Sequence, residues 1–436
     1  MRLTWVQPED LLPHQLVQSA AEGADVRDIT TRWLAAGGST EAPVSGASAQ
    51  PATPELRALA RELLKELDEL TPVWTAPEIP VLPLLEGDSF RGVERRVLEG
   101  WVGRAAGNLL GKPVEKIPRV GIREILGSSG QWPLRQYVTA VGVPDEVQAR
   151  WPWNRRSKPT SLRENIAGMP EDDDLNFAIL ALRLVEKHGD ELTTEDVAQA
   201  WLSDLPAGRV FTAERVAYRN LLDGVDPERA ALVRNPFRWW IGAQIRTDVY
   251  GWVHPGDRTA AARLALTDAR LSHTGAGVDG AIWVAAMSAA ALVLDDPREV
   301  ALAGLEAIAA DSEIARAVHL GLSLADHELD DALDVLHADY GHLHWVHAVN
   351  NSALTAYALT APDFATGVGR AVMGGWDTDS VGATVGAVLG AVRGVPSEWS
   401  EPLDNRLATS LPGMNQVSFD ELAARTLAVA KENRRG

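Results

Sequence analysis

The chain has 436 residues, of which 46% are hydrophobic and 23% are charged, and this balance excludes a mostly disordered or fibrous protein. Its 60 acidic residues outnumber its 41 Lys and Arg residues, and the net charge of −19 opposes binding to nucleic acid or to an anionic membrane. Without cysteine, disulfides, thiolate zinc sites and cysteine nucleophiles are excluded. The first residues lack a signal-peptide pattern, and the most apolar stretch, 280–294, is shorter than the roughly 18 to 20 residues of a membrane span. We therefore expect a cytoplasmic protein.

Residues 1–87 are predicted to form a helical extension. Apolar side chains mark one short helical face within residues 12–17 and another within 29–34. The stretch 37–54 is rich in Gly, Ser, Ala and Pro, which is typical of a flexible linker. Pro54–Leu70 then repeats leucine at spacings of three and four, which predicts an amphipathic helix.

Residues 88–436 are predicted to form a compact all-α domain, because helical periodicity dominates and the alternation typical of strands is nearly absent. The predicted helices are Val93–Leu110, Leu175–His188, Asp257–Leu271, Asp279–Leu294, Glu299–Ala309, Ser352–Leu359 and Ser380–Val392.

The last of these predicted helices has a face almost without side chains. Gly382, Gly386, Gly390 and Gly394 recur every four residues and therefore share one side of the helix. Each glycine lowers helix stability by about 1 kcal/mol relative to alanine. We expect close packing against another helix to offset that cost.

Two acidic clusters each precede a predicted helix. Asp377, Asp379 and Ser380 open the glycine-rich helix, and the run Glu171–Asp174 opens the helix over 175–188. Each cluster alone is compatible with a solvated helix N-terminus, where carboxylates cap the backbone and interact favourably with the dipole. The second run, however, is followed at once by apolar residues, so its carboxylates would need counter-charge. Oxygen ligands suit hard divalent cations, and one di-metal site shared by both clusters explains them together.

Two further segments are weaker signals. Glu115 follows the small-residue segment 103–114 and is a candidate catalytic acid or base, although alone it is an acid in a loop. The Ser272-His273 pair stands in a glycine-rich turn with Gly275 and could hold a phosphate or a ribose, although a lone histidine is more often structural. A His-rich stretch over 337–347 lacks the His-Glu-x-x-His spacing of zinc proteases, and we expect it to be a partly exposed helix edge.

Together these four segments resemble the motifs of the ADP-ribosylglycohydrolase family. Gly-Trp-Asp377-Thr-Asp379-Ser380 is similar to the family's Gly-Gly-Asp-Thr-Asp-Ser/Thr motif, and the Gly/Ala helix after it matches as well. The run 171–174 stands in the place of Thr-Asp-Asp-Thr, and the segment 107–115 is similar to the family's first helix. Ser272-His273 is similar to its Leu-Thr/Ser-His motif. The order and spacing of the motifs agree from about residue 91 to residue 393.

The resemblance implies an all-α fold with two Mg²⁺ or Mn²⁺ ions in a cleft. It implies catalytic roles for Glu115, Asp172 and Asp379. The implied metal ligands are Glu171, Asp172, Asp173, Asp377, Asp379 and Ser380. The implied substrate-binding residues are Asn108, Trp240, Arg246, Ser272, His273 and Gly275.

The chain also departs from the family pattern. Asn108 stands where the family usually has Asp, and Glu171 and Asp174 replace threonines. The segment 235–257 lies where the family has a glycine-rich ligand loop, but here it is rich in Trp and Arg. Its aromatic rings could stack a base, and Arg238 or Arg246 could meet a phosphate.

The reaction that the resemblance implies is hydrolysis of a ribosyl glycosidic bond, with release of ADP-ribose from an ADP-ribosylated protein or small conjugate. An N-glycosidase of a nucleoside or nucleotide metabolite on the same fold remains an alternative. A non-catalytic ADP-ribose binder is a second, although a binder has no need of two acidic clusters. A two-metal phosphoesterase is a third, but the usual histidine ligands are missing.

Overall fold

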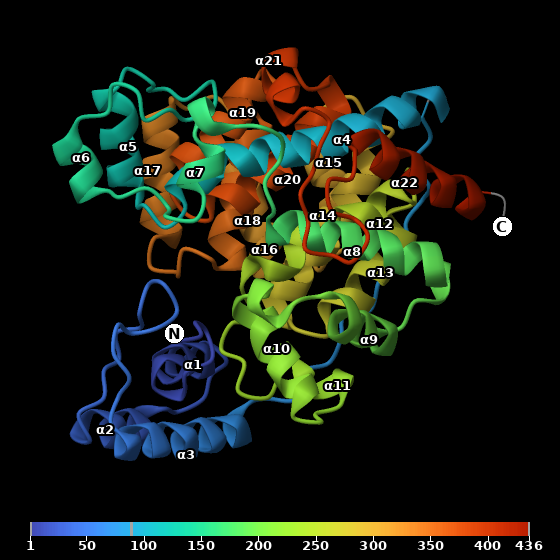
Figure 1. The fold of residues 1–436 in the computed structure, drawn as a ribbon. Helices are drawn as coiled ribbons and strands as arrows, with labels where there is room; N and C mark the ends of the chain where they lie inside the picture. The colour runs from blue at the N-terminus through green and yellow to red at the C-terminus, as the bar shows by residue number, and fades with distance from the viewer. Residues whose placement is uncertain (1, 88–89, 435–436) are drawn as a thin grey trace.

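The computed structural model describes residues 2–87 and 90–434 (Figure 1). Its described residues form α-helices and short 3-10 turns, and none of them belongs to a β-strand beyond isolated bridges. The all-α prediction is therefore confirmed. None of the described helices is long and apolar enough to cross a membrane.

Helices of the N-terminal segment, which we define as residues 2–87, are α1 (Pro8–Ala21), α2 (Arg27–Ala35) and α3 (Pro54–Leu70). The helices that follow, up to the region of the second acidic run, are α4 (Phe90–Gly111), η1 (Lys112–Val114), α5 (Arg119–Ser128), α6 (Asp145–Arg150), α7 (Lys158–Ser161), η2 (Arg163–Asn165) and α8 (Asp173–His188). The middle of the chain contains η3 (Gly189–Glu191), α9 (Thr194–Asp204), η4 (Ala207–Arg209), α10 (Thr212–Leu222), α11 (Pro227–Ala230), η5 (Ile241–Arg246), α12 (Asp248–Trp252), α13 (Arg258–Ala269) and α14 (Gly275–Ala291). The C-terminal third contains α15 (Pro297–Leu305), α16 (Glu313–Ser323), α17 (Leu329–Tyr340), α18 (Ala348–Leu359), α19 (Phe364–Met373), α20 (Thr378–Arg393), α21 (Ser397–Ser400), η6 (Glu401–Leu403) and α22 (Phe419–Asn433).

Helices α4 and α20 lie against each other through backbone at the centre of the fold (Figure 1). A Cβ atom added to Gly103 would collide with the carbonyl oxygen of Gly386, and one added to Gly107 would collide with that of Gly382. At the end of α4, a Cβ on Gly111 would collide with the carbonyl of Thr378. The glycine face predicted for 382–394 therefore packs on a second glycine face, which brings the end of α4 to the start of α20.

The other long buried helix, α14, is apolar on nearly every side. It packs on α12, α13, α15 and η5, and all its residues except Gly275 and Asp279 are buried. Such a helix belongs in a core rather than at a surface. With the α4–α20 pair it forms the support on which the connecting loops are arranged.

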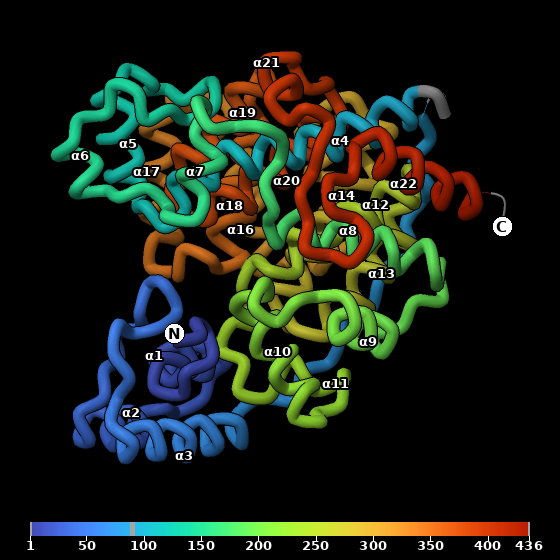
Figure 2. Tube along the Cα trace, viewed as in Figure 1, coloured from blue at the N-terminus to red at the C-terminus, as the bar shows by residue number. Residues whose placement is uncertain are grey.

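The N-terminal segment forms a lobe on one side of the rest of the chain (Figures 1 and 2). α1 and α2 pack on α3, and the stretch 37–53 between α2 and α3 contains no helix. This stretch is nevertheless tied down: the indole of Trp33 donates to the carbonyl of Ser39 at 2.8 Å, and the backbone N–H of Ser48 donates to Asp10 at 3.1 Å.

We predict that Gly107→Ala destabilises the protein by about 1–3 kcal/mol or more, because the added methyl group collides with backbone that cannot rotate away. Urea unfolding followed by circular dichroism measures the loss. The matched control is Gly127→Ala in α5, where a Cβ would meet open space, so that the better helix propensity of alanine applies. Equal stability of the two variants would contradict the backbone contact.

Candidate active site

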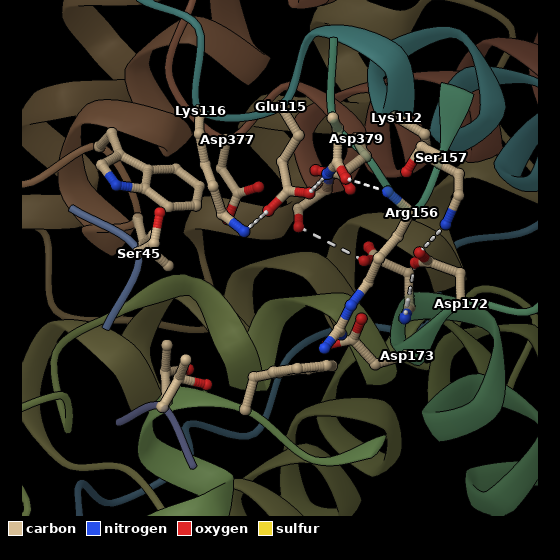
Figure 3. A pocket seen from close by; sticks show the side chains of 18 of the residues that line it. Ser45, Lys112, Glu115, Lys116, Arg156, Ser157, Asp172, Asp173, Asp377 and Asp379 are labelled. Atoms are coloured by element: carbon tan, nitrogen blue, oxygen red, sulfur yellow. Dashed lines mark hydrogen bonds and ion pairs between the residues drawn. The ribbon is translucent and has the colours of Figure 1, made fainter. Parts of the chain in front are cut away.

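Three segments meet beside the contact between α4 and α20 (Figure 3). The end of α4 and η1 supply Asn108, Lys112 and Glu115, and the hydroxyl of Thr378 donates to the carbonyl of Gly111 at 2.9 Å. The N-terminus of α8 supplies the run 172–174, and the N-terminus of α20 supplies residues 377–380. The two acidic clusters therefore lie in one site, although about 200 residues separate them in the sequence.

These segments line a cavity of about 820 Å³. The volume lies within the range of roughly 300 to 1,000 Å³ that is typical of small-molecule sites. The acidic and hydroxyl side chains that line it include Glu115, Glu171, Asp172, Asp173, Asp174, Glu214, Asp377, Asp379 and Ser380. The cationic side chains that line it are Lys112, Lys116, Arg155, Arg156 and Arg209.

Within the acidic run, the carboxylate of Asp172 is fixed by contacts to three neighbouring groups. It is the N-cap of α8, where its Oδ1 accepts from the backbone N–H of Asp174 at 3.2 Å. The side-chain amide of Asn108 donates to the same oxygen at 2.9 Å, and Lys112 pairs with the other oxygen. Burial raises the pKa of Asp172, but the Lys112 ammonium outweighs it, so the net pKa is lowered and this carboxylate is ionised.

The two clusters are joined by a hydroxyl group. The side chain of Ser380 donates to Oδ2 of Asp174 at 3.4 Å. Nearby, the backbone N–H of Asp377 donates to the side chain of Asn351 at 3.1 Å, which fixes the turn before α20. Oxygen atoms of Asp172, Asp173 and Asp174 lie within 4.8 Å of one another.

Burial and mutual repulsion raise the pKa values of the other four aspartates of the two clusters. Burial, with Asp172 and Asp379 nearby, raises the pKa of Asp173 and of Asp174 well above the ordinary range. Burial, followed by the charges of Glu115 and Asp172, raises the pKa of Asp379 to about 7. The site therefore holds more carboxylate than its side-chain cations neutralise.

Cations around the site are mostly engaged at its edges. Lys116 pairs with Glu115 at 3.1 Å, and Arg209 pairs with Glu171 at 2.9 Å. Beneath the acidic run, the buried guanidinium of Arg104 lies 3.8 Å from Asp174 and also binds Asp248. Lys112 is the cation between the two clusters, because it contacts Asp172 and the charge of Asp379 also acts on it.

The model of the ADP-ribosylglycohydrolase family matches residues 91–435 of the chain. The chain belongs to the ADP-ribosylglycohydrolase family. An uncharacterized protein of Archaeoglobus fulgidus is 26% identical over an alignment of 321 residues, and the match covers 71% of this chain and 93% of that protein. A solved structure described as an ADP-ribosylglycohydrolase-related protein complex is 22% identical, with a TM-score of 0.49, and the match covers 78% of this chain and 99% of that one. The family resemblance that the four motifs predicted is confirmed.

The family is typically metal-dependent, and the oxygen-rich side chains at the site suit a metal ion. Three aspartates of one run offer oxygens within 4.8 Å of one another, and a serine hydroxyl joins them to the second cluster. Within the part of the chain that the structure describes, Oδ1 of Asp174 and Oδ1 of buried Asn108 accept no hydrogen bond. Asn176 and Arg209 contact the two oxygens of Glu171, and Asn108 and Lys112 contact those of Asp172.

None of the six residues predicted to bind substrate is among those that line the cavity, and fully buried Asn108 reaches it only through its hydrogen bond to Asp172. Arg246 is fully buried between Glu214 and Asp268, at 2.6 and 2.5 Å, and it donates to the hydroxyl of Ser272 at 2.9 Å. His273 is buried beside Ser272, with 2.8 Å between its Nδ1 and that hydroxyl. Trp240 and Gly275 are engaged in other contacts. The ring of Trp240 stacks on that of His344, with 4.1 Å between the ring centroids. Gly275 is the first residue of α14 and lies against the ring of Trp239. Glu214, the carboxylate that pairs with Arg246, does line the cavity.

The His-rich stretch 337–347 is partly exposed, as expected, but it is a helix edge only at its start: half-buried His337 lies on α17, and exposed His342 follows the helix. α17 ends at Tyr340, and burial lowers the pKa of His344 well below its usual range. Burial also lowers the pKa of His347 to about 4, so both rings are neutral packing groups at neutral pH.

Several lining residues escaped the sequence analysis. Lys116 and Trp345 lie together, with the ammonium 5.9 Å from the ring centroid. Arg155, Arg156 and Ser157 come from the loop before α7. The signal in the sequence is the aromatic and cationic run Trp-Pro-Trp-Asn-Arg-Arg-Ser over 151–157, which ends with the lining serine.

We predict that Arg246→Met destabilises the protein by about 3–5 kcal/mol, because it leaves Glu214 and Asp268 buried without their cation. The matched control is Arg27→Met, which removes an ion pair to Asp25 whose side chains are 89% and 61% exposed. Urea unfolding of both variants measures the contrast. A loss of ADP-ribose affinity in Arg246→Met with wild-type stability would instead favour the substrate-binding role predicted from the sequence.

Proposed function

We propose that the protein is a metal-dependent hydrolase that cleaves a ribosyl glycosidic bond and releases ADP-ribose from an ADP-ribosylated protein or small conjugate. The family supports a glycosidic hydrolase of the ADP-ribose type. The observation that carries the proposal is the meeting of Glu115 and the two acidic clusters at one cavity.

The proposed cofactors are two Mg²⁺ or Mn²⁺ ions, held by Asp172, Asp173, Asp377, Asp379 and Ser380. Glu171 would join this set only by releasing Arg209 or Asn176, which now contact it. When bound, the ions would supply Lewis acidity toward the ribose hydroxyl groups and toward a water molecule.

Glu115 is the proposed base or acid of the reaction. Its carboxylate lines the cavity, held by the side chain of Asn154 and by Lys116. In this position it can accept a proton from water or donate one to the leaving group. The ionised carboxylate of Asp172, oriented by Asn108 and Lys112, and the carboxyl group of Asp379 would stabilise positive charge that develops on the sugar.

The cationic and aromatic residues that line the cavity besides the acidic clusters support a nucleotide-like substrate. Arg155, Arg156 and Lys116 bring positive charge to the cavity, and Trp345 brings an aromatic face. Guanidinium groups suit phosphate oxygens and aromatic rings suit a base, so a substrate with both groups matches this lining.

We predict that the protein releases ADP-ribose in the presence of Mg²⁺ or Mn²⁺ and that a chelator abolishes this release. The substrates are peptides ADP-ribosylated on arginine or serine, O-acetyl-ADP-ribose and a nucleoside panel, with products identified by mass spectrometry. Asp377→Asn should lower turnover at least 100-fold and remove the rise in melting temperature on metal addition, because it removes a proposed ligand. The control, Asp311→Asn, changes an exposed carboxylate and should behave as wild type.

Other products would redirect the assignment. Release of a free base would place the activity on a nucleoside or nucleotide metabolite. Tight binding of ADP-ribose without turnover of any substrate, with metal present, would contradict hydrolysis and favour the binder.

We predict that Glu115→Gln lowers kcat at least 100-fold while the metal-dependent rise in melting temperature stays. Glutamine keeps the shape and the contact to Asn154 but cannot transfer a proton. Turnover by stopped assay and thermal shift with Mn²⁺ measure the two effects. Activity near wild type in Glu115→Gln would contradict the proton-transfer role.

A further inference from the structure

The N-terminal segment supplies part of the cavity wall. Thr4, Trp5, Val44 and Ser45 line the same cavity as Glu115 and the two acidic clusters, and Figure 3 shows Ser45 among the labelled lining side chains. The family match begins at residue 91, so all four residues lie outside it. This wall, residues 4–5 and 44–45, is therefore contributed by a part of the chain that the family match does not cover.

The two loops of the wall are fastened to each other. Trp5 has a left-handed backbone with φ of 64°, and its N–H donates to the carbonyl of Gly46 at 2.6 Å. Gly46 also has a positive φ of 75°, and a Cβ there would collide with the Trp5 ring. The loop that carries Val44 and Ser45 thus takes its position from Trp5.

Trp5 in turn packs into the family domain. Its ring is 5% exposed and contacts Phe237 and Trp240 edge-on, with centroid separations of 5.4 and 5.7 Å. His14 of α1 lies against the same two rings at 5.1 and 5.3 Å. Edge-to-face pairs of this kind stabilise an interface beyond the area they bury.

Polar contacts fix the same arrangement. The fully buried Arg238 donates through Nε to Glu22 at 2.8 Å, and Arg215 donates to the carbonyl and the hydroxyl of Thr4 at 2.9 and 2.8 Å. Asp68 accepts from the backbone N–H of Arg234 at 2.7 Å. Breaking the Arg238–Glu22 pair would leave a buried charge unpaired, and breaking the Arg215 contacts would remove two hydrogen bonds from a buried guanidinium. The wall is therefore fixed rather than a mobile lid.

We propose that this wall restricts the substrate to small ADP-ribosyl conjugates and excludes folded ADP-ribosylated proteins, an inference that rests on the proposed function. A modified side chain of a folded protein would have to bring its own backbone to the cavity mouth, where the loop of Val44 and Ser45 stands. A conjugate of ADP-ribose with a free amino acid or acyl group has no such backbone. Its size suits a cavity of about 820 Å³.

The test compares one linkage on carriers of increasing size. ADP-ribosyl-arginine, an arginine-modified short peptide and a folded protein modified on a surface arginine are supplied to the full-length protein with Mn²⁺, and the serine linkage forms a second series. We expect kcat/KM to fall at least 100-fold from the free amino acid conjugate to the folded protein. Equal values across a series would overturn the inference and leave the proposed function intact.

Ser45→Trp tests the wall directly. Ser45 is exposed to the cavity and has no part in the proposed chemistry, so a large ring there should fill space without touching the acidic clusters. We expect at least a tenfold loss of affinity for free ADP-ribose by calorimetry, with an unchanged metal-dependent thermal shift. The matched control is Val17→Trp in α1, whose side chain is 69% exposed and does not line the cavity.

The binding readout separates the two levels of failure. A protein that turns over no conjugate contradicts the proposed hydrolase, yet ADP-ribose affinity still tests the wall. Unchanged affinity in Ser45→Trp overturns the role of the wall whether or not turnover is observed.

Discussion

The close contact between the backbones of α4 and α20 is the constraint on which the site depends. Because Gly103 and Gly107 of one helix face Gly386 and Gly382 of the other, nothing but backbone separates the helix axes. This closeness brings the end of α4, with Lys112 and Glu115, to the start of α20. Helix termini present unpaired backbone groups and a local dipole, so they are natural places to gather charged side chains. The glycines therefore lower helix propensity but allow the close helix contact that brings the site residues together.

This contact places several carboxylates close together in a buried site, and the neighbouring cationic side chains neutralise only part of their charge. Lys112 stabilises Asp172, and Arg104 lies beneath Asp174, yet burial and repulsion still raise the pKa values of Asp173 and Asp377. Arg246 with its two carboxylates, Glu214 and Asp268, is a smaller buried cluster in which one guanidinium contacts both acids directly. An imbalance concentrated at the cavity is what a cation-binding site would show, whereas a core under selection for stability alone would carry fewer carboxylates.

The sequence predicted the helical class and the family because both depend on local patterns. Leucine spacing gave the bounds of α3, and glycines spaced by four revealed a packing face before its partner was known. The acidic runs stood out in the sequence because carboxylates placed beside an apolar helix raise the free energy of the fold unless a counter-charge lies nearby. The placement of Arg246, Ser272 and His273 was not predictable in this way. Their residue types suit phosphate binding and buried pairing equally, and local pattern does not show that Glu214 and Asp268 both fold against Arg246.

The contacts of the N-terminal segment, which the proposed specificity depends on, were likewise not predictable from the sequence. Low-complexity composition over 37–54 suggested a linker, since composition reports the chain's own flexibility and carries no information on what it contacts. The position of Ser45 depends on Trp5, whose place depends on an aromatic pocket of Phe237 and Trp240 more than 200 residues later. The proposed chemistry of this protein lies at helix termini that a family motif identifies, whereas the proposed control of access lies in loops outside the family match. A segment that the family motifs do not cover can set specificity through the side chains that it places at a cavity.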